Sequence, residues 1–179
     1  MSVKRPLSLR AAAALLPIVF VAGACGQSSQ EDNSERDDDG QVVEGGEVGV
    51  FRLQEGDCLV LPSVIDSPEV EQIDDVQALP CDQPHDGEVV LVADEQFADL
   101  DEFPGETVAV EQGTPSCIAA LDEYTGTDFE SSTFDVLVLV PSEASWAAID
   151  DRGLTCIGVT LDDALTEAID TTGSIRAAS

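Results

Sequence analysis

Four cysteines in the body of the chain constrain its fold more than any other feature. They are Cys58, Cys81, Cys117 and Cys156, and a fifth cysteine, Cys25, lies near the start. An even number of cysteines in an exported chain predicts two disulfides, for which four cysteines allow three pairings. We expect Cys58 to pair with Cys81. Cys117 then pairs with Cys156, and in both cases the two cysteines come from segments that could lie next to one another.

The first 24 residues have the anatomy of an export signal. Basic residues (Lys4, Arg5 and Arg10) precede an uncharged, mostly apolar stretch over residues 11–24. This stretch is shorter than the roughly 18–20 apolar residues that span a bilayer. Small residues then precede Cys25, as in bacterial lipoprotein signals, where the thiol is acylated. Ordinary secretory cleavage and an uncleaved anchor are the alternatives, and in each case the rest of the chain works outside the cytoplasm. We expect a lipid anchor at Cys25, on the outer face of the cytoplasmic membrane.

The chain is strongly acidic, with 37 Asp and Glu against 7 Lys and Arg and a net charge of −30. This balance excludes nucleic acid as a partner, because phosphate binding needs clusters of Lys and Arg that the chain lacks. The acids are spread over most of the chain, which favours a surface adapted to salt over a cation-binding surface. We expect no cofactor, with calcium as the one candidate, at the acidic pairs Asp74-Asp75, Asp150-Asp151 and Asp162-Asp163.

The composition divides the chain into four parts. Residues 1–24 are the signal, residues 25–46 a polar, acidic tether, residues 47–175 one folded domain and residues 176–179 a fraying tail. Apolar runs predict strands over residues 48–53, 58–61, 70–79, 87–93, 134–140 and 154–161, a helix over 106–126 and one more short helix over 162–170. We therefore expect an α+β domain, with a mainly antiparallel sheet packed against a central helical segment and stapled by two disulfides.

Periodicity is clearest in the second half of the expected helix. Cys117, Ala120, Leu121 and Tyr124 recur at helical spacing and form one apolar face, and Gly126 is the stop signal. The strand expected over residues 134–140 is apolar enough at its centre to be buried on both faces.

One segment gathers the residue types that carry chemistry. His85 is the single histidine, and Cys81, Asp82, Asp86 and Glu88 surround it. Zinc needs three or four N, S or O ligands, so a free Cys81 with His85 and a carboxylate would make a site. If Cys81 is oxidised, the segment is a rigid turn in which His85 bonds a neighbouring carboxylate. Oxidation also removes a Cys–His nucleophile, and no Gly-x-Ser-x-Gly elbow is present, so we expect no enzyme.

The single tryptophan, Trp146, has two interpretations. It caps the core and stacks with Arg152, which is the usual place for one Trp in a small domain, or it is a surface anchor for a ligand.

These landmarks resemble the septum formation domain family, a group of exported or membrane-tethered envelope domains of actinobacteria. The resemblance spans roughly residues 54–175, and residues 81–89 are its most specific part. The residues that carry it are Gly56-Asp57-Cys58, Pro80 to Val89, Phe103-Pro104-Gly105, Cys117, Tyr124 with Gly126, Pro141 with Trp146, Arg152 with Cys156, and Thr172-Gly173-Ser174. The family implies involvement in division or envelope growth and implies no reaction.

The sequence therefore predicts a non-enzymatic, lipid-anchored envelope domain that binds another envelope protein. The alternative is a metal-dependent enzyme or metal-binding protein centred on Cys81, His85 and Glu88. The candidate binding residues are Asp82, His85, Asp86, Glu88, Trp146 and Arg152.

Overall fold

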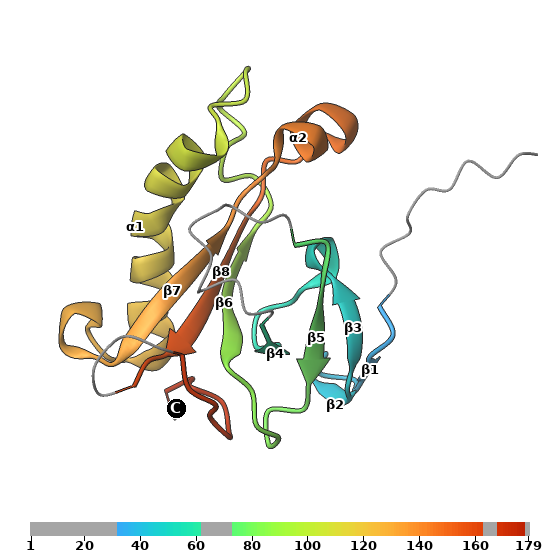
Figure 1. Ribbon diagram of the computed structural model, residues 1–179, viewed down its shortest axis with the longest axis vertical. Helices are drawn as coiled ribbons and strands as arrows, with labels where there is room; N and C mark the ends of the chain where they lie inside the picture. The colour runs from blue at the N-terminus through green and yellow to red at the C-terminus, as the bar shows by residue number, and fades with distance from the viewer. Residues whose placement is uncertain (1–31, 62–72, 163–167, 178–179) are drawn as a thin grey trace, which may run out of the picture.

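The structure is a computed structural model that describes residues 32–61, 73–162 and 168–177 (Figure 1). Its strands are β1 (Glu35–Arg36), β2 (Val42–Glu44), β3 (Gly46–Gly49), β4 (Cys58–Val60), β5 (Asp75–Leu79), β6 (Gly87–Ala93), β7 (Phe134–Leu139) and β8 (Leu154–Thr160). Its helices are α1 (Glu106–Thr125) and α2 (Glu143–Ile149), with 3-10 turns η1 (Val50–Arg52) and η3 (Phe129–Ser131). Cys25 and most of the helix expected over residues 162–170 lie outside the described residues.

A six-stranded sheet forms the centre of the fold, in the order β3-β5-β4-β6-β8-β7. Every neighbouring pair of its strands is antiparallel. Helix α1 lies across one face of the sheet and contacts β6, β7 and β8 (Figure 1). The fold is thus α+β with a mainly antiparallel sheet, which confirms the expected fold class.

Helix α1 is held close to the sheet by its buried face. Cys117, Leu121 and Tyr124 are buried on this face, as the helical spacing predicts, whereas Ala120 is half-buried. At Gly113 a side chain would meet Leu154 of β8 at 2.8 Å, so glycine lets the helix approach the strand closely. The helix ends at Gly126, which takes the left-handed conformation that glycine accepts without strain.

The two disulfides join the expected pairs of cysteines. Cys58 at the start of β4 bonds Cys81, which follows β5, and the two Cα atoms are 5.3 Å apart. Cys117 of α1 bonds Cys156 of β8, also with Cα atoms 5.3 Å apart. One bridge therefore ties together two strands of the sheet, and the other fixes the helix to the sheet.

Helix α2 has no counterpart among the helices expected from the sequence. Ser142 and Ser145 form a reciprocal capping box at its start, which satisfies backbone N–H groups that the first turn leaves free. Trp146 on this helix is buried, and the Arg152 guanidinium lies 3.5 Å from its ring centroid. The stacked, core-capping interpretation of Trp146 is therefore confirmed.

Two strands differ from expectation. The strand expected over residues 48–53 begins earlier, at Gly46, and leaves the sheet after Gly49 into η1. The strand expected to be buried on both faces, β7, is an edge strand paired only with β8, and most of its residues are half-buried. An apolar run predicts a strand without revealing whether a further strand will lie beside it.

The segment expected to be a solvated tether is folded onto the domain over its described part, residues 32–46. Strands β1 and β2 form a hairpin there, and the Arg36 guanidinium donates two hydrogen bonds, of 2.5 and 3.0 Å, to the carboxylate of Asp57. Asp57 is buried, and its hydrogen bond raises the pKa of Arg36. Few apolar residues predict disorder, but here a buried ion pair and the buried side chain of Val42 dock the segment.

We predict that Arg36→Ala lowers the free energy of unfolding by about 3–5 kcal/mol, because it leaves the buried Asp57 without a cation. Chemical denaturation of the full chain measures the change. Arg52→Ala is the matched control, because Arg52 is exposed and its removal should cost less than about 0.5 kcal/mol. Equal effects of the two substitutions would show that the Arg36–Asp57 pair does not dock the hairpin.

Candidate functional site

The segment between β5 and β6 brings the chemically interesting residues to one end of the sheet. Pro80 accepts a hydrogen bond from the Gln83 N–H at 2.9 Å, which makes a tight turn directly after β5. Cys81 in this turn is disulfide-bonded. The backbone of His85 then pairs with that of Thr171, far along the chain, before β6 begins.

Glu88 is the buried charge of the site. It lies in β6, opposite Cys58 on β4, and only 1% of its surface is exposed. Its carboxylate accepts hydrogen bonds from the Tyr124 hydroxyl at 2.5 Å, the Ser174 hydroxyl at 2.5 Å and the Ile175 N–H at 2.7 Å. A buried carboxylate is costly without donors, and these three compensate for the water it has lost.

His85 is equally buried, at 1% exposure. Its Nδ1 lies 2.8 Å from the carbonyl oxygen of Gln83, which can only accept a hydrogen bond, so Nδ1 carries the proton. In the neutral ring Nε2 is then a lone-pair acceptor, and no described residue gives it a hydrogen-bond partner. We expected a carboxylate beside this histidine, but the group that accepts its hydrogen bond is the backbone carbonyl of Gln83.

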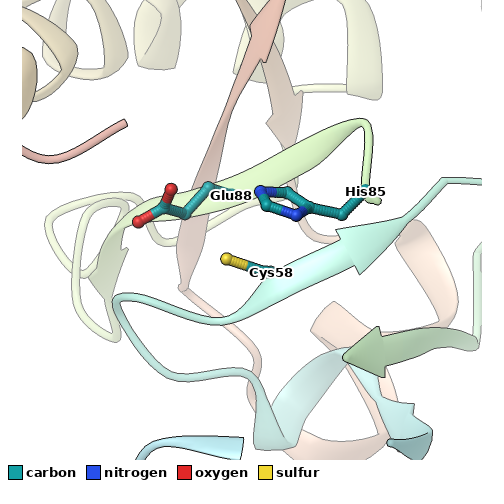
Figure 2. Close-up of side chains that lie close together, drawn as sticks. All are labelled: Cys58, His85 and Glu88. Carbon is teal, nitrogen blue, oxygen red and sulfur yellow. The ribbon is translucent and has the colours of Figure 1, made fainter. Parts of the chain in front are cut away.

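Cys58, rather than Cys81, is the cysteine that lies with His85 and Glu88. One candidate ligand atom from each of the three residues lies within 4.8 Å of the others. Figure 2 shows the imidazole ring pointing toward Glu88, with the Cys58 sulfur beside them. Because Cys58 is disulfide-bonded, its sulfur is not a thiolate, and only the histidine and the carboxylate are good metal ligands in this state.

The end of the chain is bound to this cluster; we call residues 168–177 the C-terminal strap. Besides the contacts to His85 and Glu88, the Gly173 N–H donates to the Cys81 carbonyl at 2.5 Å. The Ala177 N–H donates to the Tyr124 carbonyl at 2.8 Å. Arg176 pairs with Glu55 and lies over the Tyr124 ring, 4.2 Å from its centroid. Residues 176 and 177 are therefore held to the domain, where the sequence analysis expects fraying.

The other candidate binding residues lie apart from the cluster or on its edge. Asp82 is exposed. Asp86 is half-buried, accepts a hydrogen bond from the Leu61 N–H at 2.7 Å, and has its pKa raised by burial. Trp146 and Arg152 stack on one another at the opposite end of β6. A partner that docks on the folded domain reaches Asp82 but not the buried ring of Trp146.

Asp150 and Asp151, one of the acidic pairs considered for calcium, make contacts within the turn that follows α2. Asp150 caps the C-terminal end of α2 in the left-handed conformation, and its carboxylate pairs with Arg152 at 2.8 Å. A carboxylate oxygen of Asp151 accepts a hydrogen bond from the Gly153 N–H at 2.9 Å. Asp163, of another candidate pair, lies outside the described residues. Calcium binding stays a prediction.

Sequence reasoning selects Glu88 and His85 but misses their partners. Tyr124 and Ser174 belong to the motifs that carry the family resemblance, yet nothing in their spacing assigns them to Glu88. One signal was available: Glu88 interrupts the otherwise apolar run of β6, and a charge in such a strand demands donors from elsewhere in the fold.

These features define a disulfide-stapled α+β domain whose C-terminal strap is bonded to a buried polar cluster. The sequence model of the septum formation family matches residues 55–179, and the chain belongs to that family. No curated protein and no solved structure matches the chain. Within the described residues, the helices are too short or too polar for a membrane span.

We predict that Tyr124, the single tyrosine, titrates near 12, because burial and the hydrogen bond to Glu88 raise its pKa from 10.0 to about 12. In the unfolded chain the Tyr124 hydroxyl loses its proton near the ordinary pKa of 10.0. The contribution to stability is therefore full below pH 10 and is lost, by about 2–3 kcal/mol in total, as pH rises to about 12. Tyrosinate absorbance measures the midpoint.

Glu88→Gln is the matched variant, because it removes the carboxylate charge and keeps the size of the side chain. It should move the Tyr124 midpoint back toward 10, with the part due to burial remaining. An unchanged midpoint in this variant would contradict the Tyr124–Glu88 interaction.

Proposed function

We propose that this chain is a lipid-anchored domain on the outer face of the cytoplasmic membrane, which acts in septum formation by binding another envelope protein. In this proposal it performs no catalysis. Family membership links the chain to septum formation. The anchor at Cys25 rests on the basic and then apolar leader that precedes this cysteine.

The observation that carries the binding role is that the most distinctive polar segment, residues 81–88, makes internal contacts. Glu88 bonds helix α1 and the C-terminal strap, and His85 bonds Gln83. Side chains used in this way rigidify the domain, and two disulfides add to the effect. A rigid body loses little conformational entropy when it binds a partner, which supports recognition as the role of the domain.

Charge limits the kind of partner. The chain carries a net charge of −30, so an acidic protein would be repelled at cellular salt concentration. A neutral or basic envelope protein has no such penalty, and a basic one is attracted over the Debye length. Anionic wall polymers would need bridging cations, which makes them the less favoured partner.

We predict that Cys25→Ser, made in the full-length chain in its own cells, shifts most of the protein from the membrane to the soluble fraction. The hydroxyl cannot accept the thioether-linked lipid, so the hydrophobic attachment is lost. Fractionation measures attachment, and a fluorescent fusion measures the share of protein at septa, which should fall together with it.

Ser28→Ala, in the same segment, is the control and should leave both measurements unchanged. Membrane attachment that survives Cys25→Ser would refute the lipid anchor. A wild-type chain spread evenly around the cell, whose deletion leaves the number of septa unchanged, would refute the role in septum formation.

We predict that crosslinking in intact cells joins the full-length chain to a neutral or basic envelope protein. The complex re-formed from the purified proteins should weaken as salt rises, because screening removes part of the attraction. The Cys25→Ser chain is the control for proximity to the membrane. Failure to crosslink any envelope protein would contradict the binding role, and an affinity independent of salt would contradict the charge argument.

A further inference from the structure

A histidine nitrogen without a partner, enclosed in the protein, needs an explanation. Nε2 of His85 has no hydrogen-bond partner among the described residues, and the side chain is only 1% exposed. Leaving a buried acceptor unpaired costs about 1–3 kcal/mol. A metal ion is one group that can accept this lone pair.

We infer that opening the Cys58–Cys81 disulfide creates a binding site for a zinc-type divalent cation, with ligands from Cys58, Cys81, His85 and Glu88. The oxidised protein has the disulfide in place of this site. Metal and disulfide are thus mutually exclusive states of the same two sulfur atoms.

The histidine is already arranged as a metal ligand. A ligating histidine usually donates its other ring N–H to a carbonyl or carboxylate, which fixes the tautomer and the direction of the ring. Nδ1 of His85 makes this bond, at 2.8 Å from the Gln83 carbonyl oxygen, and leaves Nε2 with its lone pair. Figure 2 shows the ring pointing toward Glu88, from which a second ligand would come.

The strand register places the remaining ligands. Cys58 on β4 is directly opposite Glu88 on β6, and candidate ligand atoms of these two residues and of His85 lie within 4.8 Å of one another. Ligand atoms around one tetrahedral zinc lie roughly 3–4 Å apart, so about an ångström of movement closes the site. Cys81 supplies the fourth ligand, since its Cα is 5.3 Å from that of Cys58.

Donors from α1 and the strap already hold the Glu88 carboxylate in place. Tyr124, Ser174 and Ile175 all bond its oxygens, in the manner of the outer hydrogen bonds that orient a metal-binding carboxylate. Among the described residues, this is the one group of three or more candidate ligands that lie this close together. The second disulfide, Cys117–Cys156, therefore provides an internal comparison.

A dithiol reductant can open the Cys58–Cys81 disulfide. Two electrons and two protons pass from the dithiol to the Cys58–Cys81 bond, which breaks to give two thiols, while the reductant becomes a disulfide. The cation then displaces the two thiol protons, which go to solvent, and binds both thiolates. Two thiolates and the Glu88 carboxylate oppose the charge of a divalent cation, so the loaded site has a net charge of −1.

The test is a titration of the full-length chain with Co²⁺ as a spectroscopic probe, before and after reduction with a phosphine. Reduced wild-type protein should bind one equivalent, with thiolate-to-cobalt charge-transfer bands and the strong ligand-field bands of a tetrahedral centre, and Zn²⁺ should displace the cobalt. Oxidised protein should show neither set of bands.

Two variants separate this site from metal bound by any free thiols. His85→Ala should weaken Co²⁺ binding at least 10–100-fold in the reduced protein and alter the ligand-field bands. Replacing Cys117 and Cys156 with Ser should leave binding intact. Equal affinity and equal spectra for reduced wild type and His85→Ala would overturn the proposal, as would failure of the reduced wild-type protein to bind.

Reduction alone could loosen the fold, so a second measurement follows thermal unfolding of the reduced protein with and without Zn²⁺. Zn²⁺ should raise the melting temperature of the reduced wild-type chain, because a cation that binds only the folded state stabilises it. The same addition should not raise that of reduced His85→Ala. A rise of the same size in both would show that the histidine is not a ligand.

Discussion

The buried carboxylate of Glu88 is the interaction on which the rest of the structure depends. A charge inside a sheet is tolerated only if the protein replaces the water it has lost, and here the donors come from two distant parts of the chain. Tyr124 is on helix α1, whereas Ser174 and Ile175 are on the C-terminal strap. The helix and the strap must therefore both be in place before Glu88 is satisfied. This requirement couples the C-terminal strap to the centre of the sheet.

A second regularity is how an acidic chain uses its few cations. Of the four arginines that follow the leader, three make specific contacts in the structure. Arg36 neutralises the buried Asp57, Arg152 lies on the Trp146 ring, and Arg176 covers the Tyr124 ring. Each joins segments that are separate in sequence or closes a turn. The acids, in contrast, lie mainly on the surface.

Apolar periodicity is a local signal, and it predicted the fold class, the main strands and α1. The even number of cysteines and the order of the expected segments predicted both disulfides, which join residues 23 and 39 positions apart. Other contacts between distant segments have no such signal. Arg36 lies in a polar run that predicts disorder, and the run is docked by contacts with distant residues, among them the ion pair with Asp57 and the core around Val42. Helix α2 is short, and its serine capping box is a weaker signal than an apolar face. At the candidate site, composition selected His85 and Glu88, but their partners depend on the path of the strap.

The docked hairpin has a consequence for where the domain can lie. If Cys25 carries the proposed lipid, about seven residues separate it from Asp32, where the described fold begins, and they span at most roughly 25 Å when fully extended. A polar segment flexible through residue 46 would have allowed three times that contour length. On that proposal the protein stays near the bilayer surface and samples a thin layer of the envelope. The proposed partner would then present its binding surface within that layer.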